Sequence, residues 1–402
     1  MGTLEREINL NDNQEIILTI GKNQDLTKIP PVIKVDYEHF LKDIKSGCRM
    51  FIDDGLIECR INKINKTAQT AEALVIKGGV LKSRKGINLP GISVSASSIT
   101  EKDLRFLDFG IKAGVDFIAQ SFVRNHRDVK ILKERIRASG SNIMVVAKIE
   151  KYEAVGNFDS ILKHADAIMV ARGDLGIELP EEDVPNIQKE IIKKANLVGK
   201  PVITATQMLD SMIRNPRPTR AEVSDVANAI LDGSDALMLS GETASGHYPL
   251  ESLKMMVRII NRTEENLDYS DILQKKFLVK QNTITESISF AACEIANVLG
   301  AKAIITSTQS GSTARQISKN RPQGIIIGAS PSYRVVRQLM LSWGVIPVKT
   351  EFKQDIDQVI AEAVKVSKKT KLLSGKDRVV ITGGIMVNRP GSTNFIHVKD
   401  IE

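Results

Sequence analysis

The feature that most restricts the fold of this chain is an alternation, from residue 91 to about residue 266, of short apolar runs with longer segments of helical period. Apolar runs separated by amphipathic helices are typical of βα units, whose strands lie buried in a parallel sheet. The expected strands are residues 115–121, 143–149, 167–170, 202–206 and 236–240, and the expected helices are residues 127–138, 155–164, 187–197, 220–231 and 250–265. We therefore predict an α/β domain here.

Polar side chains gather where these apolar runs end. The run ends carry Gln120 and Ser121, Lys148 and Glu150, Arg172 and Asp174, Thr206, and Ser240 and Glu242. In a (β/α)8 barrel, the carboxyl ends of the strands form the active-site face. An open doubly wound sheet also binds ligands at that edge, so the pattern favours a barrel without distinguishing the two folds.

The number of units differs from that of a closed barrel. Five βα units follow residue 91, whereas a closed barrel has eight units and takes about 250 residues. We therefore expect a (β/α)8 barrel lacking its first strands, with about 70 residues unaccounted for. Such a sheet would expose two edges, so poor solubility or association is expected.

Two further regions flank the barrel. Residues 1–90 contain short apolar runs separated by turn residues, which predicts a small all-β domain. Its expected strands are residues 15–20, 48–52, 56–61 and 72–76. The region 283–402 has a second α/β pattern and is expected to be a separate domain, joined by the polar stretch 268–282. The expected domains are 1–90, 91–266 and 283–402.

Charge and composition exclude several classes of protein. The net charge is +8, but basic and acidic residues are interleaved and aromatic residues make up only 4%, so a nucleic-acid surface is not expected. No apolar run is long enough to span a membrane, and the first residues lack the apolar core of a signal peptide. Cys48, Cys59 and Cys293 are too scattered for a disulfide framework or a zinc site. These features predict a cytoplasmic protein that binds small anionic substrates.

The strongest group of candidate functional residues is Lys148 and Glu150 with Asp174. Alternation along a strand turns Lys148 and Glu150 to the same side, and Asp174 follows the next strand. One ammonium group and two carboxylates can therefore converge, and two hard oxygen ligands with open positions suit Mg²⁺ or Mn²⁺. A structural ion-pair network has the same composition, so spacing alone leaves both alternatives open.

Two loops could bind anions. A short helical turn is expected after Val170, where backbone N–H groups around Gly173 would hold a carboxylate or phosphate, although Gly173 also fits a plain tight turn. The stretch 308–313 lies between a strand and a helix, and its hydroxyls and amides could cradle a phosphate or simply cap the helix. Thr206 is either a hydroxyl facing a substrate or an ordinary strand threonine.

Five specific motifs extend this interpretation. They are Lys85-Gly-Ile-Asn-Leu-Pro-Gly91, Val170-Ala-Arg-Gly-Asp-Leu-Gly-Ile-Glu178, Thr204-Ala-Thr-Gln-Met-Leu209, Pro216-Arg-Pro-Thr-Arg-Ala-Glu-Val-Ser-Asp-Val-Ala-Asn228 and Leu237-Met-Leu-Ser-Gly-Glu-Thr243. Together they closely resemble the pyruvate kinase family, and the resemblance covers essentially the whole chain.

The resemblance implies transfer of the phosphoryl group of phosphoenolpyruvate to ADP, giving pyruvate and ATP in glycolysis. It implies that Glu150 and Asp174 bind Mg²⁺ or Mn²⁺. Lys148 would stabilise charge on the migrating phosphoryl group and the enolate oxygen. Thr206 would lie where the enolate is protonated through ordered water.

Further implied residues complete the expected sites. The implied substrate-binding residues are Ser121, Ala171, Arg172, Gly173, Asp174 and Thr206. Asp54 and Lys85 of the all-β domain would close over the nucleotide as a lid. The implied residues for a sugar-phosphate effector are Thr308, Ser310, Gly311, Ser312 and Thr313. Members of the family are usually homotetramers, and no nucleic acid or membrane partner is expected.

The resemblance also contains a departure. In the family, a first segment supplies three strands, the ligands of K⁺ and arginines that grip phosphates, and Met1 stands where that segment meets the lid. K⁺ is therefore expected for the family but not assigned to any residue here. One explanation is an ordinary enzyme whose sequence is incomplete. Another is a non-catalytic relative that binds sugar phosphate or subunits. A metal-dependent lyase on a similar barrel is a third.

Overall fold

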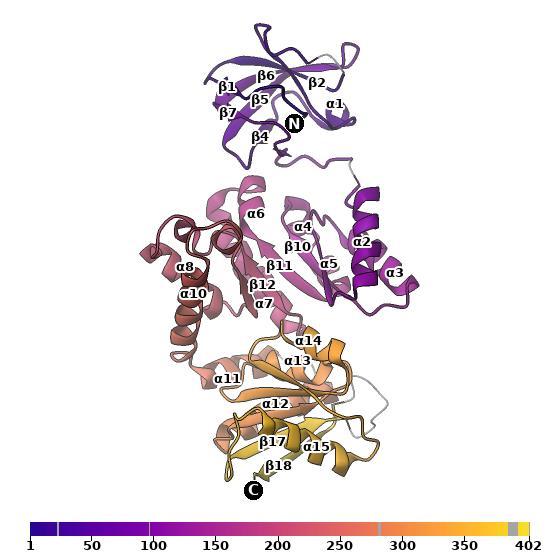
Figure 1. Ribbon diagram of the computed structural model, residues 1–402, viewed down its shortest axis with the longest axis vertical. Coiled ribbons are helices and arrows are strands. Elements are labelled where there is room, and N and C mark those ends of the chain that lie inside the picture. Colours follow the sequence, from indigo (N-terminus) through magenta and orange to yellow (C-terminus); the bar gives the residue numbers. More distant parts are fainter. Residues whose placement is uncertain (22–23, 96, 280–282, 385–392, 402) are drawn as a thin grey trace.

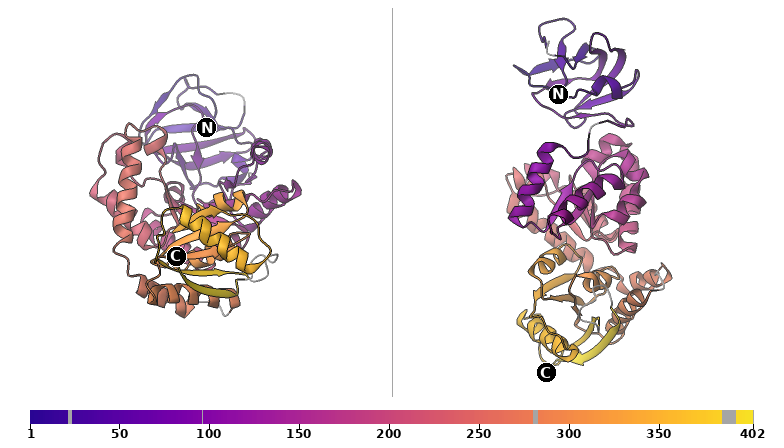
Figure 2. Two further views of the ribbon diagram at one scale, coloured as in Figure 1. Left: turned by 60° about the horizontal axis from the view of Figure 1, so that its bottom comes forward. Right: turned by 90° about the vertical axis from the view of Figure 1, so that its right-hand side faces the viewer.

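Three bodies follow one another along the chain. The computed structural model describes residues 1–21, 24–95, 97–279, 283–384 and 393–401. A β body lies at the N-terminal end, a helix-flanked sheet lies in the middle, and a second α/β body lies at the C-terminal end (Figures 1 and 2). Within these residues, no helix is long and apolar enough to cross a membrane. The predicted order of the three regions is therefore the order found, while the predicted domain boundaries stay a prediction.

The N-terminal body is the predicted all-β lid domain. It contains a six-stranded sheet of order β3-β2-β6-β5-β4-β8 and a two-stranded sheet of β1 and β7. Its elements are β1 (Ile8–Leu10), β2 (Glu15–Thr19), β3 (Val32–Lys34), α1 (Phe40–Asp43), β4 (Arg49–Ile52), β5 (Ile57–Asn65), β6 (Thr70–Lys77), β7 (Gly79–Leu81) and β8 (Ile87–Asn88). In β5, alternate residues Ile57, Cys59 and Ile61 are buried, as expected for a sheet with one covered face.

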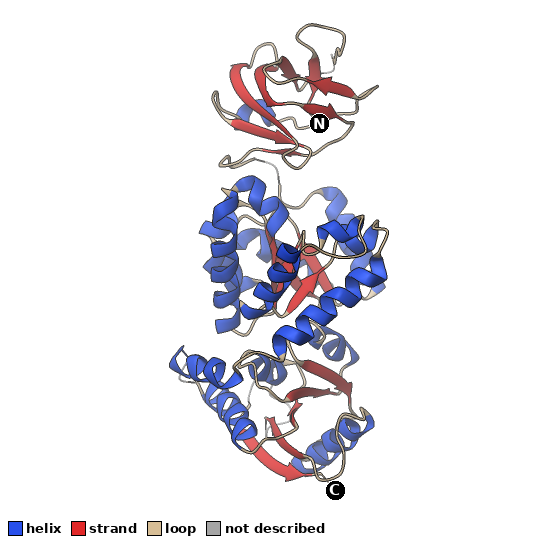
Figure 3. Cartoon of the chain, turned by 90° about the vertical axis from the view of Figure 1, so that its left-hand side faces the viewer, coloured by secondary structure: helices blue, strands red, loops and turns tan. Residues whose placement is uncertain are grey.

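The middle body is a five-stranded parallel sheet whose order, β13-β12-β11-β10-β9, follows the order in the chain. Its strands are β9 (Phe117–Gln120), β10 (Met144–Ile149), β11 (Ala167–Ala171), β12 (Val202–Ala205) and β13 (Ala236–Met238). Its helices are α2 (Glu101–Ala113), α3 (His126–Ala138), α4 (Tyr152–Gly156), α5 (Phe158–His164), α6 (Arg172–Glu178), α7 (Val184–Leu197), α8 (Arg220–Leu231), α9 (Gly241–Ala244) and α10 (Pro249–Glu264), with 3-10 turns at Glu181–Asp183 and Asp210–Ile213. Figure 3 shows helices packed around the sheet. In the part of the chain that the structure describes, β9 and β13 have no further strand partner.

The five predicted strands are all present, but the helices differ from the prediction in two places. Helix α2 was not predicted, although a capping box between Thr100 and Asp103 begins it. The single helix expected over 155–164 is two helices, α4 and α5, separated at Asn157. The Asn157 side chain donates to the carbonyl oxygen of Arg124 (3.0 Å). This contact outside the helix explains why the chain turns there.

The C-terminal body has a five-stranded sheet of order β16-β15-β14-β17-β18, parallel except for β18. Its elements are α11 (Tyr269–Val279), α12 (Ile284–Val298), β14 (Ala303–Ser307), α13 (Ser312–Ser318), β15 (Ile325–Ser330), α14 (Tyr333–Leu339), β16 (Val345–Lys349), α15 (Ile356–Lys369), β17 (Arg378–Gly383) and β18 (Phe395–Asp400). The polar stretch 268–282, expected to connect the two domains, contains α11, a helix that was not expected there. Leu273 of this helix is buried in the same core as Phe290.

A buried ion pair joins the C-terminal body to the barrel. Arg321 donates to the Asp235 carboxylate (3.0 Å) and to the carbonyl oxygen of Gly233 (2.7 Å), and its guanidinium lies 5.0 Å from the ring centre of Trp343. Asp235 directly precedes β13, and its other oxygen accepts the N–H of Val202 (2.9 Å) at the start of β12. The C-terminal body is therefore attached at the amino ends of the barrel strands, opposite the predicted site.

Replacing Arg321 with methionine should lower the free energy of unfolding by about 3 kcal/mol, because the Asp235 carboxylate would stay buried without its main cation. Urea unfolding followed by circular dichroism and by fluorescence of Trp343, the one tryptophan in the sequence, measures this. Arg262→Met is the control, since its pair with Glu265 is exposed and should contribute little. Equal stability of R321M and R262M would contradict the prediction.

Candidate active site

Three neighbouring strands end at the same level of the sheet. Lys148 of β10 lies opposite Met169 of β11, and Val170 of β11 lies opposite Thr204 of β12. The residues that follow each strand therefore emerge along one edge. In a parallel barrel sheet this edge is where functional residues collect.

Lys148 and Glu150 form a close pair at the end of β10. The Lys148 Nζ lies 2.5 Å from Glu150 Oε1 and donates to Ser121 Oγ at 2.8 Å. The Glu150 side chain is 1% exposed, and its Oε2 accepts the backbone N–H of Phe122 (2.7 Å). Phe122 has a φ of +55°, so the chain after β9 turns sharply to direct its N–H at the carboxylate. Both oxygens of this buried carboxylate are thus oriented by the protein.

Asp174 reaches the same edge from the first turn of α6. Burial raises the pKa of its carboxyl, the nearby Glu150 raises it further, and Lys148 opposes the rise. No hydrogen bond or ion pair holds the Asp174 side chain among the described residues. A divalent cation would relieve the repulsion between these two carboxylates, so the donor set fits Mg²⁺ or Mn²⁺ chemically. In the described ranges, no group of three or more His, Cys, Asp or Glu residues is arranged to hold a metal ion.

The side chain of Arg172 contacts neighbouring elements and does not point toward Lys148, Glu150 or Asp174. Its guanidinium donates to the Asp225 carboxylate (2.7 Å) and to the carbonyl oxygen of Thr206 (2.8 Å). Arg172 therefore joins the start of α6 to the end of β12. The guanidinium is therefore engaged by these partners, while the backbone of Arg172 begins α6 directly after Ala171.

Gly173 lets Thr206 approach α6. A Cβ atom at Gly173 would lie 2.7 Å from Thr206 Cγ2, a distance that two carbon atoms do not adopt without a shift. Thr206 itself has a φ of +76°, which is unusual for a β-branched residue and persists because Arg172 holds its carbonyl group. The requirement for glycine here is thus close packing and not a turn.

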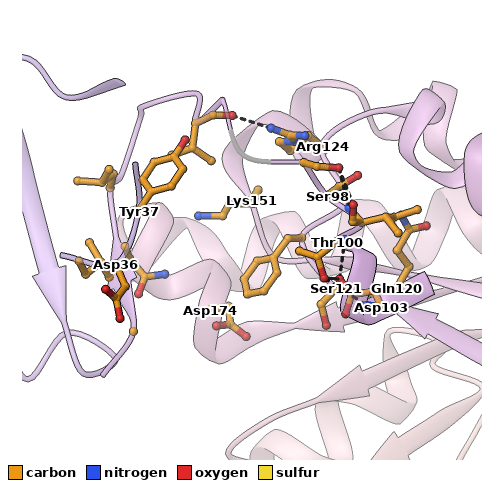
Figure 4. Close-up of a pocket in the computed structure, with 18 of the residues that line it drawn as sticks. Asp36, Tyr37, Ser98, Thr100, Asp103, Gln120, Ser121, Arg124, Lys151 and Asp174 are labelled. Atoms are coloured by element: carbon orange, nitrogen blue, oxygen red, sulfur yellow. Dashed lines mark hydrogen bonds between the residues drawn. The ribbon is translucent and has the colours of Figure 1, made fainter. Parts of the chain in front are cut away.

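A cleft of about 1000 Å³ separates the lid from the barrel (Figure 4). Asp36 and Tyr37 approach it from the lid, and Ser121, Lys151 and Asp174 approach it from the barrel. Both predicted lid residues also line this cleft: they are Asp54 and Lys85. Lys85 Nζ lies 2.8 Å from the carboxylate of Asp53, the residue before Asp54, and does not pair with Asp54 itself. The structure brings Asp54 and Lys85 to the cleft, whereas Lys148, Glu150 and Thr206 are not among its lining residues.

Sequence reasoning missed a second ion pair at this edge. Lys151 directly follows Glu150, and its Nζ pairs closely with the carboxylate of Glu178 at the end of α6. The two side chains are 14% and 1% exposed. Their spacing along the chain gives no hint of this pair, because it depends on where α6 packs.

The predicted effector loop follows β14 in the C-terminal body. Gly311 has a φ of +79° and precedes α13, while Thr308 and Thr313 are buried. The Thr313 hydroxyl bonds to the Thr393 hydroxyl (2.8 Å). Ser310 and Ser312 are half-buried and so remain the hydroxyl-bearing residues of this loop that a ligand could reach.

Comparisons with known proteins agree with this geometry. A family model described as "Pyruvate kinase, barrel domain" matches residues 2–253, and one described as "Pyruvate kinase, alpha/beta domain" matches residues 286–399. The chain is 46% identical over 395 residues to a pyruvate kinase of Geobacillus stearothermophilus and 44% identical over 398 residues to pyruvate kinase 2 of Synechocystis. Each alignment covers 98% of this chain and 67% of the relative.

A solved structure is similar as well. The crystal structure of a pyruvate kinase from Cryptosporidium parvum superimposes with a TM-score of 0.90 at 36% identity. That match covers 100% of this chain and 81% of the other chain. The chain thus spans about two thirds of the length of the curated relatives named above.

Affinity for Mn²⁺ should begin to fall at a pH above 3.8, the ordinary pKa of an aspartate, as the solution is acidified. The ion needs the deprotonated carboxylate, and the raised pKa of Asp174 means that this group takes up a proton earlier. Titration with Mn²⁺, followed by electron paramagnetic resonance at a series of pH values, measures this. Asp174→Asn should weaken binding, and the exposed Asp159→Asn should not. Affinity that stays constant down to pH 3.8 would contradict the prediction.

Proposed function

Because the chain belongs to the pyruvate kinase family of phosphotransferases, we propose that its site transfers the phosphoryl group of phosphoenolpyruvate to ADP. Relatives named pyruvate kinase, at 42–46% identity, support both this function and its enzyme class. The observation that carries the proposal for this chain is the convergence of Lys148, Glu150, Asp174 and Thr206 at the ends of β10, β11 and β12. The bond between phosphorus and the enol oxygen would break, a β-phosphate oxygen of ADP would take the phosphoryl group, and the enolate would take a proton to give pyruvate.

Lys148 supplies the positive charge for this step. Negative charge grows on the enol oxygen as its bond to phosphorus breaks, and a fixed ammonium group beside it lowers the energy of that state. Ser121 Oγ (2.8 Å) and Glu150 Oε1 (2.5 Å) hold the ammonium in place. Little reorganisation is then needed when the charge develops.

Glu150 and Asp174 are the residues that would hold Mg²⁺ or Mn²⁺. A cation held by these two carboxylates would supply positive charge to offset the negative charge of the substrate phosphate. The low exposure of Glu150 and the raised pKa of Asp174 support this assignment. The family resemblance also predicts K⁺, for which we name no ligand.

The start of α6 and the end of β12 would bind the rest of the substrate. The first backbone N–H groups of a helix have no partners within the helix, so those of Arg172, Gly173 and Asp174 can donate hydrogen bonds to a carboxylate. Thr206 stands beside them because Gly173 leaves room for it. Its hydroxyl would orient the water that protonates the enolate.

The lid and the C-terminal body have proposed roles too. Asp54 and Lys85 would close on the nucleotide phosphates and exclude water. The loop 308–313 would bind a sugar-phosphate effector, with Ser310 and Ser312 as its accessible hydroxyls. A homotetramer in the cytoplasm is the expected assembly and location, by resemblance to the family.

Lys148→Met should lower kcat about 100- to 1000-fold, because the enol oxygen would lose its fixed cation. Pyruvate formation from phosphoenolpyruvate and ADP, measured with a coupled assay, gives this value. Lys163→Met, at an exposed position on α5, is the matched control and should keep full activity.

Two further measurements show whether a lower kcat of Lys148→Met comes from the lost charge or from a lost fold. Circular dichroism of the Lys148→Met protein shows whether the fold is kept, and Lys148→Arg should recover part of the activity because it restores the charge. Full turnover by a folded Lys148→Met protein would overturn the role of Lys148. Binding of Mn²⁺ without turnover by the unaltered chain would favour the non-catalytic alternative.

A further inference from the structure

The lid touches the barrel through the last turn of α6. Figure 1 shows α6 at the end of the barrel that faces the lid. Gly55 of the lid lies against Ile177, since a Cβ atom at Gly55 would be 4.0 Å from Ile177 Cγ1. The next residue of α6 is Glu178, which is buried and pairs with Lys151. Two adjacent residues of one helix turn therefore lie at the boundary between the lid and the barrel.

The two oxygens of the Glu178 carboxylate differ in their contacts. Lys151 pairs with Oε1, while Oε2 is buried and has no hydrogen-bond partner in the described part of the chain. Burial raises the pKa of this carboxyl, and Lys151 and the lid residue Asn88 both oppose the rise. Asn88 opposes the rise in pKa as a side-chain hydrogen-bond donor beside Glu178, although no donor meets the full geometry of a hydrogen bond at Oε2 in the described residues. A buried, unpaired carboxylate oxygen is costly and gains most from a donor.

Asn88 is well placed to transmit such a contact to the predicted nucleotide-binding residues. It ends β8, which pairs with β4 so that Asn88 lies opposite Phe51 and Ile87 lies opposite Ile52. The turn that carries Asp54 directly follows β4, and Lys85 precedes β8 by two residues. A bond from Asn88 to α6 would thus determine how far Asp54 and Lys85 stand from Asp174.

We propose that the Lys151–Glu178 pair is the seat on which the lid closes, with the Asn88 amide donating to Glu178 Oε2 in the closed state. Lys151 and Glu178 are positioning residues: they hold α6 and the lid, and do not touch the reacting atoms. Lys151 keeps the carboxylate ionised and oriented, and Asn88 completes its hydrogen bonding. The kinetic consequence rests on the proposed function, because it concerns closure over ADP.

The kinetic test uses Asn88→Asp, which places a second carboxylate against Glu178 without changing the size of the side chain. The Michaelis constant for ADP should rise at least about tenfold, since a misplacement of about 1 Å can cost 100-fold. The Michaelis constant for phosphoenolpyruvate should change much less, because its predicted ligands lie on the barrel. The double variant Lys151→Met/Glu178→Gln should act in the same direction and leaves no buried charge unpaired.

Lys133→Met is the matched control. Lys133 pairs with Asp166 at 2.6 Å, and its side chain is 19% exposed. The substitution therefore removes a comparable ion pair of the barrel. Asp166 directly precedes β11, at the opposite end of the strands from the lid. Both Michaelis constants should stay unchanged in this variant. An equal rise in K133M and N88D would show a general loss of barrel stability and overturn the seat.

A second readout does not depend on turnover. Spin labels at Lys66→Cys on the lid and Lys130→Cys on α3, in a Cys48→Ser background, report the distance between the two bodies with and without ADP and Mg²⁺. The distance distribution should be broader in N88D and in the double variant than in the otherwise unaltered protein and in K133M. A distribution in N88D as narrow as that of the unaltered protein would overturn the proposal.

These two readouts separate the possible failures. An unaltered chain without turnover would contradict the proposed function. The distances between the spin labels would then be the test of whether the lid closes on the Lys151–Glu178 pair. Normal turnover, with an unchanged Michaelis constant for ADP and unchanged distances in N88D, would overturn the seat and leave the proposed function in place.

Discussion

Parallel pairing of β10, β11 and β12 is the constraint on which the rest of the site depends. The pairing is continuous from Lys148 opposite Met169 to Val170 opposite Thr204, so these strands end side by side. A shift of one residue would turn Lys148 and Glu150 away from the edge, because side chains alternate along a strand. The apolar residues buried beneath them, such as Ile149 and Val170, oppose such a shift. The hydrophobic core thereby holds the charged groups in register.

Helix α6 positions Asp174 at the carboxyl ends of these strands. It is only seven residues long, yet contacts at its start and its end hold it. Arg172 ties its start to the end of β12, and Glu178 ties its end to Lys151 after β10. Asp174 lies between these attachments, so its carboxylate is held near Glu150 despite their repulsion. Both attachments are largely shielded from water, where charge pairs are strong but costly to break.

Much of the fold was predictable because it depends on local patterns. The strands of the barrel are apolar runs bounded by polar residues, and alternation along β10 correctly placed Lys148 beside Glu150. The errors arose where a contact outside the segment decided the outcome. The bond from Asn157 to Arg124 divides one expected helix into two, and the burial of Leu273 accompanies a helix that was not expected within the connecting stretch 268–282. Helix α2 is different, since its capping box was present in the sequence and was overlooked.

By itself, the sequence determined the strand and helix alternation, the side of β10 on which Lys148 and Glu150 lie, and the family, because short-range periodicity and contiguous motifs carry all three. Only the tertiary structure decided that the side chain of Arg172 braces β12, that Gly173 serves close packing, and that Lys151 pairs with Glu178 below the lid. Each of these contacts joins residues more than 20 positions apart. Their distance depends on how α6 packs between two strands and the lid, and no local pattern records that packing.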